Sequence, residues 1–165
     1  MKKIFDGRLL KLFTGQRRLP NGIKCYLEEI RHPGASLVVP FLGKKIIFIR
    51  QFRPVIGKYI WELPAGTLEP GEKPSACAKR ETAEETGYSV VALSKIGEIY
   101  TTPGFCTERI HVFRAECSGR EYAKGDADEL IRVKLFTKAE IRKMFAAGKI
   151  NDSKTICALS FADII

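Results

Sequence analysis

Three carboxylates with the spacing of one helical turn are the residues most able to do chemistry in this chain: Glu81, Glu84 and Glu85. In a helix, Glu85 would lie about 40° and Glu84 about 60° from Glu81, on opposite sides of it. Clustered carboxylate oxygens suit Mg²⁺ or Mn²⁺, which keep several waters and accept phosphate oxygens as further ligands. The alternative is a solvent-exposed glutamate-rich helix in which Arg80 pairs with Glu84.

The helix that would carry these carboxylates is predicted over Pro74–Thr86. Its interior has no glycine or proline and is rich in Ala, Lys, Arg and Glu. Pro74 suits the first turn and Gly87 the position just past the end, whereas Lys73 is a poor N-cap. Glycines and a proline over residues 66–71 predict a loop before the helix.

The remaining pattern predicts a mixed α+β domain in layers. Strand-like segments lie before and after one central helix, without regular βαβ alternation or internal repeats. The expected strands are residues 4–13, 23–30, 35–41, 45–52, 90–100, 109–116 and 130–136, and the further helices are residues 138–147 and 152–164.

Composition narrows the class of protein. The 165 residues are 45% hydrophobic and 28% charged, which fits one globular domain and excludes a disordered tract. No apolar stretch approaches the roughly 20 residues of a membrane span, and charge follows Met1 too closely for a signal peptide. A cytoplasmic protein without a membrane partner is therefore expected.

The charge and the cysteines exclude other site types. A net charge of +9 favours anionic partners such as phosphate compounds, but no uninterrupted basic run is present, so nucleic acid is an unlikely partner. Five cysteines without a C-x-x-C pair predict reduced, mostly buried thiols rather than a disulfide framework or a zinc site. His32 and His111 are isolated, as packed or surface histidines usually are.

Residues 66–88 resemble the Nudix box, G-x5-E-x7-R-E-U-x-E-E-x-G-U. Thr82 is the one departure, because the box has a bulky aliphatic residue there and threonine would bury a hydroxyl. The resemblance implies a Nudix hydrolase: an α/β/α sandwich with a mixed sheet that hydrolyses a nucleoside diphosphate linked to another moiety. The matching residues are Gly66, Glu72, Arg80, Glu81, Glu84, Glu85, Gly87 and Tyr88.

The same resemblance implies a site with two or more Mg²⁺ or Mn²⁺ ions. Glu81 and Glu85 would be the main metal ligands, with Glu84 as an additional ligand and the Ala65 carbonyl as a backbone ligand. Gly66 would lie on the substrate side. Glu72 and Arg80 would brace the loop against the helix.

The surroundings of the box resemble the ADP-ribose pyrophosphatase branch of that family. The similar segments are residues 50–54 (Arg-Gln-Phe-Arg-Pro), 61–66 (Trp-Glu-Leu-Pro-Ala-Gly) and 152–155 (Asp-Ser-Lys-Thr). Pro103, sixteen residues beyond the last glycine of the box, and Gly104 would belong to a specificity loop. The implied reaction converts ADP-ribose to AMP and ribose 5-phosphate.

Further roles follow from this resemblance. Arg53 would contact the diphosphate, because a guanidinium offers paired donors to phosphate oxygens. Glu62, in the strand leading to the box, would be a substrate-side carboxylate or a structural hydrogen-bond acceptor. Glu129, in the acidic loop 125–131, would be the general base, with Glu84 as second choice. A solvated hairpin tip is the alternative for that loop.

The resemblance also predicts the organisation of the chain. Residues 1–33 would be an antiparallel strand segment that crosses to a partner in a homodimer, and residues 34–165 the Nudix domain. Two alternative functions stay open. One is hydrolysis of another nucleoside diphosphate sugar such as GDP-mannose, and the other is a noncatalytic module that binds ADP-ribose or RNA.

Overall fold

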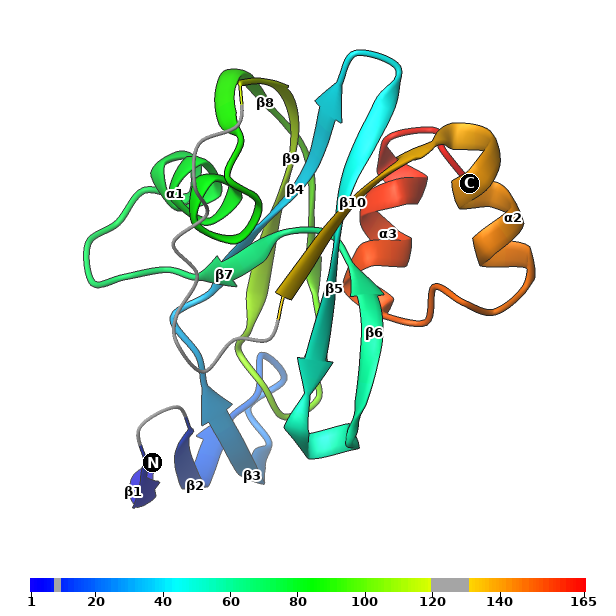
Figure 1. The fold of residues 1–165 in the computed structure, drawn as a ribbon. Helices are drawn as coiled ribbons and strands as arrows, with labels where there is room; N and C mark the ends of the chain where they lie inside the picture. Colours follow the sequence, from blue (N-terminus) through cyan, green and yellow to red (C-terminus); the bar gives the residue numbers. More distant parts are fainter. Residues whose placement is uncertain (8–9, 120–130) are drawn as a thin grey trace.

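A computed structural model describes residues 1–7, 10–119 and 131–165 (Figure 1). A seven-stranded mixed sheet and a separate three-stranded sheet account for the strands of this part. The elements are β1 (Lys2–Asp6), β2 (Lys11–Arg18), β3 (Lys24–Arg31), β4 (Ala35–Leu42), β5 (Lys45–Arg53), a 3-10 turn (Pro54–Ile56), β6 (Lys58–Glu62), β7 (Ala65–Thr67), α1 (Pro74–Thr86), β8 (Ser89–Tyr100), β9 (Arg109–Ser118), β10 (Ile131–Thr137), α2 (Lys138–Ala146) and α3 (Ser153–Phe161).

The larger sheet lies between two helical layers. Its strand order is β10-β5-β4-β9-β8, with β6 beside β5 and β7 beside β4. β4 and β9 are parallel, and the other pairs are antiparallel. Helix α1 covers one face, and α2 and α3 cover the other (Figure 1). The predicted α+β class and the α/β/α sandwich are therefore confirmed.

Each face of the sheet contributes to its own apolar core. Alternate residues of β5 point to opposite faces, so Phe48 packs toward α2 and α3, while Ile47 packs beneath α1. Both side chains are fully buried, and burial of such a side chain contributes about 1.5–3 kcal/mol. The two cores therefore anchor α1 to one face of the sheet and α2 and α3 to the other.

The sheet splits between β4 and β5. The two strands pair only next to their hairpin, at Phe41–Ile46 and Leu42–Lys45. Farther along, β4 pairs instead with β7, and the N–H of Val38 donates to the carbonyl of Pro64. β5 continues beside β6. The loop that precedes α1 is therefore inserted into the sheet where its two halves diverge.

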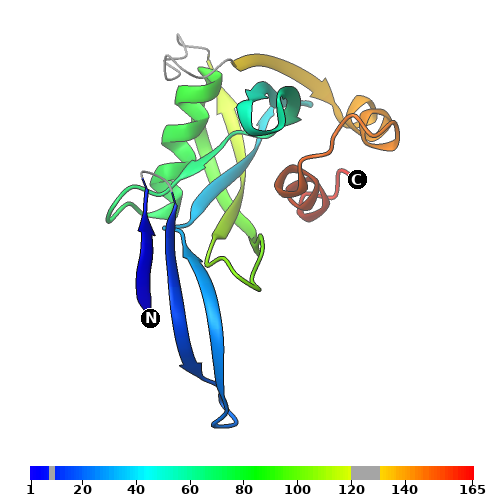
Figure 2. The same cartoon turned by 90° about the horizontal axis from the view of Figure 1, so that it is seen from below.

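The three N-terminal strands form a sheet of their own. Their order is β1-β2-β3, all antiparallel, and the β2–β3 hairpin extends away from the rest of the molecule (Figure 2). Several large apolar side chains of this three-stranded sheet and its turns are exposed: Ile4, Phe5, Ile23 and Tyr26 are each more than half exposed. We name β1–β3 the N-terminal arm.

Helix α1 begins and ends where the sequence predicts. Pro74 occupies its first turn, and Lys73 makes no side-chain capping hydrogen bond. Gly87 closes the helix with φ of 74°, a left-handed conformation that glycine adopts without steric cost. The hydroxyl of Thr82 is fully buried and donates to the Ala78 carbonyl at 2.7 Å, so the departure from the box leaves no unpaired polar group.

Four sequence predictions were wrong in detail. The expected strand 4–13 is two strands, β1 and β2, because the chain reverses after Gly7, whose N–H donates to the Leu10 carbonyl. The last helix ends at Phe161 rather than 164, and Asp152 is its N-cap. β7 was not predicted. All five cysteines are free, but only Cys77 and Cys117 are buried.

No helix within the described ranges is long and apolar enough to cross a membrane.

Candidate active site

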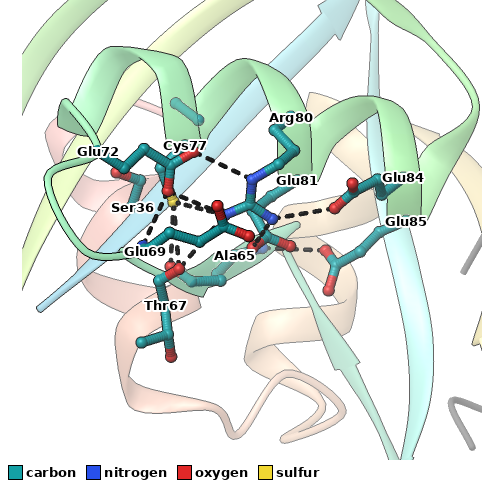
Figure 3. Close-up of polar contacts among 12 residues, drawn as sticks. Ser36, Ala65, Thr67, Glu69, Glu72, Cys77, Arg80, Glu81, Glu84 and Glu85 are labelled. Carbon is teal, nitrogen blue, oxygen red and sulfur yellow. Dashed lines mark hydrogen bonds and ion pairs between the residues drawn. The ribbon is translucent and has the colours of Figure 1, made fainter. Parts of the chain in front are cut away.

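Arg80 is the centre of an acidic cluster on α1 (Figure 3). Its Nε and Nη2 atoms each lie 3.0 Å from an oxygen of Glu72, in the loop before the helix. Its Nη1 donates to Glu81 at 2.6 Å and to Glu84 at 3.0 Å, and its Nη2 donates to the Thr67 carbonyl at 3.3 Å. One guanidinium thereby ties the loop, β7 and two carboxylates of the helix together.

The cluster sets the protonation of its members. The hydrogen bond from Arg80 lowers the pKa of Glu72 from 4.5 to about 2, and the hydrogen bond from the Glu69 N–H adds to this effect. The same ion pairs raise the pKa of Arg80. Burial beneath the loop raises the pKa of Cys77 to about 11, so its thiol stays protonated.

Glu81 and Glu85 point toward the same strand. A Cβ at Gly66 would collide with the carboxylate of Glu81, so only glycine allows this close approach. One turn later, the carboxylate of Glu85 accepts the N–H of Ala65 at 3.0 Å. The two carboxylates therefore meet the backbone of β7 at adjacent residues (Figure 3).

The donor set fits a hard divalent cation. Glu81, Glu84 and Glu85 supply carboxylate oxygens, and β7 lies beside them with the carbonyl of Ala65. Within the described ranges, however, no three acidic, histidine or cysteine side chains are already arranged to hold a metal ion. Arg80 holds two of the carboxylates, so metal ions would compete with its ion pairs.

A second cluster surrounds Glu62, which is fully buried at the end of β6. Arg53 reaches it with two hydrogen bonds, Nε to Oε1 and Nη2 to Oε2, both 2.7 Å. Lys154 Nζ donates to Oε2 as well. Burial opposes ionisation of Glu62, but the two cations outweigh it and hold its pKa below the ordinary value. One carboxylate thus fixes two cationic side chains from different elements.

The start of α3 is locked onto β6 in the same place. The side chain of Asp152 accepts the N–H of Thr155 at 3.0 Å and lies 3.0 Å from Lys154 Nζ. The buried hydroxyl of Thr155 accepts the N–H of Leu63 at 3.0 Å. The segment 152–155 therefore caps α3, pairs with Glu62 and satisfies the backbone just before β7.

A pocket of about 420 Å³ opens between these two clusters. Its walls come from β4, β5, β7 and β9, from the loop between β8 and β9, and from the start of α3. Arg53 and Lys154 give it two cations, which suits an anionic ligand. Its walls are Ala35, Arg53, Ala65, Gly66, Thr67, Thr101, Glu108, Ile110, Ser153 and Lys154.

The structure brings together most of the residues singled out in the sequence, but not all. Pro103 and Gly104 are exposed in a turn next to Thr101 and are not among the pocket walls. This turn is tied to the N-terminal arm, because Ile30 N donates to the Phe105 carbonyl at 2.7 Å. Glu129 lies outside the described residues.

Sequence reasoning missed several residues of the pocket wall. Lys154 stands in the segment 152–155, which carried the family resemblance, but no role was assigned to it. Glu108 and Thr101, joined by a 2.9 Å hydrogen bond, carried no signal in the sequence. Only the antiparallel pairing of β8 and β9 brings these two residues together across their connecting loop.

Comparison with known proteins agrees with this geometry. The model of the NUDIX domain matches residues 30–159. The chain belongs to the Nudix family. An ADP-ribose pyrophosphatase from Bacillus subtilis (strain 168) is 38% identical over 166 residues, which cover 99% of this chain and 90% of that protein. A methanol dehydrogenase activator from Bacillus methanolicus has the same identity and the same coverage.

Two further similarities are more distant. A GDP-mannose pyrophosphatase from Escherichia coli O139:H28 (strain E24377A / ETEC) is 36% identical over 153 residues, covering 81% of this chain and 79% of that protein. A solved structure described as an ADP compounds hydrolase has a TM-score of 0.85 at 21% identity, covering 98% of this chain and 89% of that one. That likeness shows a shared fold.

The depressed pKa of Glu72 makes stability depend on pH. Its folded pKa, about 2, lies below the ordinary 4.5, so its ion pair with Arg80 stabilises the fold above pH 4.5 and is lost as pH falls toward 2. We expect Glu72→Gln to lower the free energy of unfolding at pH 6 and to lose this difference progressively below pH 4.5.

Urea unfolding of both proteins between pH 6 and pH 3 measures the effect. Glu28→Gln, at an exposed position of β3, is the matched control and should show no such convergence. An equal deficit of Glu72→Gln at every pH would contradict the ion pair.

Proposed function

We propose that the protein hydrolyses the diphosphate bond of ADP-ribose to AMP and ribose 5-phosphate. The observation that carries this proposal is the pocket whose walls include Arg53, Lys154 and the β7 residues that the glutamates of α1 contact. Similarity over nearly the whole chain to a protein named ADP-ribose pyrophosphatase supports the choice of substrate.

Glu81, Glu85 and Glu84 would hold the metal ions, together with the Ala65 carbonyl. We propose Mg²⁺, with Mn²⁺ as a substitute, and two or more ions. When bound, such ions lower the pKa of water and neutralise charge on the diphosphate. Arg80 would release Glu81 and Glu84 on loading but keep Glu72, so the loop would stay attached to α1.

Arg53 and Lys154 would bind the diphosphate oxygens. Arg53 has five N–H groups and uses two on Glu62, and Lys154 has three and uses them in part on Glu62 and Asp152, so each cation keeps a donor for the pocket. Glu62 would hold both side chains in one orientation, so little conformational entropy is lost on binding. Direct contact of Glu62, Gly66, Pro103 or Gly104 with substrate stays a prediction.

Proton transfer would fall to Glu129, with Glu84 as the second candidate. A carboxylate close to metal ions has a low pKa and is a weak base, so the proton acceptor needs some distance from them. Glu84 is the most exposed carboxylate of the α1 cluster, and Glu81 and Glu85 are more enclosed.

We also propose a homodimer formed through residues 1–33, which contain the N-terminal arm, with residues 34–165 as the catalytic domain. The exposed apolar side chains of the arm, among them Ile4, Phe5 and Tyr26, are the supporting observation. A cytoplasmic location stays a prediction from the sequence.

GDP-mannose is the second candidate substrate, supported by the relative named for it. It contains the same diphosphate group as ADP-ribose, so the cationic pocket could bind either substrate. The base and the sugar on either side of the diphosphate would then determine the preference. A noncatalytic binder of ADP-ribose or RNA is the remaining alternative, and the intact set of carboxylates argues against it.

A substrate panel tests the proposal. Purified protein with Mg²⁺ is offered ADP-ribose, GDP-mannose and other nucleoside diphosphate sugars, and kcat/KM is measured from the nucleotide released. We expect ADP-ribose to be preferred. Preference for GDP-mannose would contradict ADP-ribose as the substrate but not diphosphate hydrolysis as the reaction. If no diphosphate is hydrolysed, both the substrate and the reaction are contradicted.

Replacing Glu85 separates metal binding from substrate binding. Glu85→Gln keeps an oxygen for the Ala65 N–H but loses the charge, so we expect kcat to fall by at least about a hundredfold. Binding of ADP-ribose in chelator, measured by calorimetry, should change little. Glu116→Gln, an exposed carboxylate of β9, is the control, and full activity of Glu85→Gln would contradict the metal role.

Replacing Lys154 tests the cationic half of the pocket. Lys154→Met removes one donor to the diphosphate, and we expect KM to rise about tenfold, with a smaller change in kcat. Lys154→Arg should recover part of the affinity. Lys149→Met, an exposed lysine just before α3, is the control. If the folded Lys154→Met variant has an unchanged KM, Lys154 does not bind substrate.

A further inference from the structure

A second pocket lies behind the first, on the α1 side of the same strands. Its volume is about 510 Å³, and its walls include His32, Leu68, Pro74, Tyr100, Arg109 and His111. No role in the proposed reaction has been given to any of these six residues.

Neighbouring residues of the same segments line the two pockets, which lie on opposite faces of the sheet. Gly34 lines the second pocket and Ala35 the first. Leu68 and Thr67 alternate in the same way, and along β9 Arg109 belongs to the second pocket while Ile110 belongs to the first. A ligand in the second pocket would therefore lie one strand thickness from the catalytic pocket.

Arg109 brings positive charge to this pocket. Its guanidinium is half exposed, and among the residues that the structure describes its one ion contact is with Glu98, at 3.9 Å. Glu98 is engaged more closely by Lys95, at 2.6 Å. Within residues 1–7, 10–119 and 131–165, the Arg109 side chain donates no hydrogen bond, so its donors remain available to a ligand.

His111 is a buried imidazole without a hydrogen bond among the described residues. Its side chain is 10% exposed, and Glu98 Oε2 lies 3.8 Å from its Nδ1. Burial, followed by the charges of Arg109 and Lys95, lowers its pKa, and Glu98 opposes this in part. The ring is therefore neutral at pH 7 and carries one N–H. Among the described residues no acceptor takes up this N–H, so a ligand in the pocket could accept a hydrogen bond from it.

His32 supplies another donor. Its Nδ1 accepts the N–H of Gly34 at 3.1 Å, which assigns the ring proton of the neutral form to Nε2. Pro74, the first residue of α1, is also in the wall, so the positive end of the helix dipole lies at the pocket. The Tyr100 ring and Leu68 provide apolar surface beside these donors.

We propose that this second pocket binds a phosphate monoester. Arg109, His111 and the start of α1 suit the phosphate, and Tyr100 with Leu68 suits the organic part. Both products of the proposed reaction, AMP and ribose 5-phosphate, belong to this class. Their identity as natural ligands rests on the proposed function, whereas the site itself does not.

The two histidines make a direct test possible, because the chain has only these two and both line the pocket. Histidine-labelled protein in chelator is titrated with AMP, ribose 5-phosphate or inorganic phosphate while the imidazole NMR signals are followed. We expect AMP or ribose 5-phosphate to shift them. Arg109→Gln should raise the dissociation constant at least about tenfold, and Arg114→Gln, the same change on the other face of β9, should not.

Lys154→Met separates the two pockets, because it changes only the catalytic one. Retention of the histidine shifts in this variant supports the second site. The proposal is overturned if the signals stay unmoved by both monoesters, if only inorganic phosphate moves them, or if Arg109→Gln binds as tightly as the parent protein. Since no metal or turnover is involved, these outcomes are independent of the hydrolysis assay.

Discussion

The ion pairs of Arg80 are the interaction on which the catalytic geometry depends. Glutamates at adjacent positions of one helical turn repel one another, and a loop rich in glycine has little intrinsic preference for one conformation. Arg80 opposes both effects at once, because its guanidinium contacts Glu72 in the loop and Glu81 and Glu84 on the helix. The acidic side of α1 and the strand β7 are thereby held face to face without any metal ion.

Glu62 plays the corresponding role for the cationic side of the pocket. A fully buried carboxylate is costly unless it is paired, and here Arg53 and Lys154 both pair with it. The pairing also joins β5, β6 and α3. The pocket therefore lies between two charged clusters. In one, Arg80 pairs with three glutamates, and in the other, Glu62 pairs with Arg53 and Lys154.

Local signals in the sequence predicted the helix of the first cluster and its Arg80–Glu84 pair, and the family resemblance supplied the bracing role of Glu72 and Arg80. The contact of Glu62 with Lys154 in the second cluster was not predicted. Pro74 and Gly87 mark the ends of α1, and the residues that contact Arg80 lie within fourteen positions of it, so their proximity follows from a loop and a helix. The pairing of Glu62 with Lys154 spans 92 positions and depends on how α3 packs against β6. β7 was not predicted because it has only three residues, in a segment whose glycines and proline predict a loop. His32 and His111, isolated in the sequence, line one pocket only because β3, β4 and β9 converge.

The attachment of the N-terminal arm to the rim of the pocket has a consequence for assembly. Ile30, near the end of β3, exchanges two main-chain hydrogen bonds with the segment that follows Pro103, through Phe105 and Thr107. The loop that contains Phe105 and Thr107 is therefore held against the base of a hairpin that extends away from the rest of the molecule. A protein that binds the hairpin is therefore coupled, through these two hydrogen bonds, to the loop between Thr101 and Glu108, both of which line the pocket.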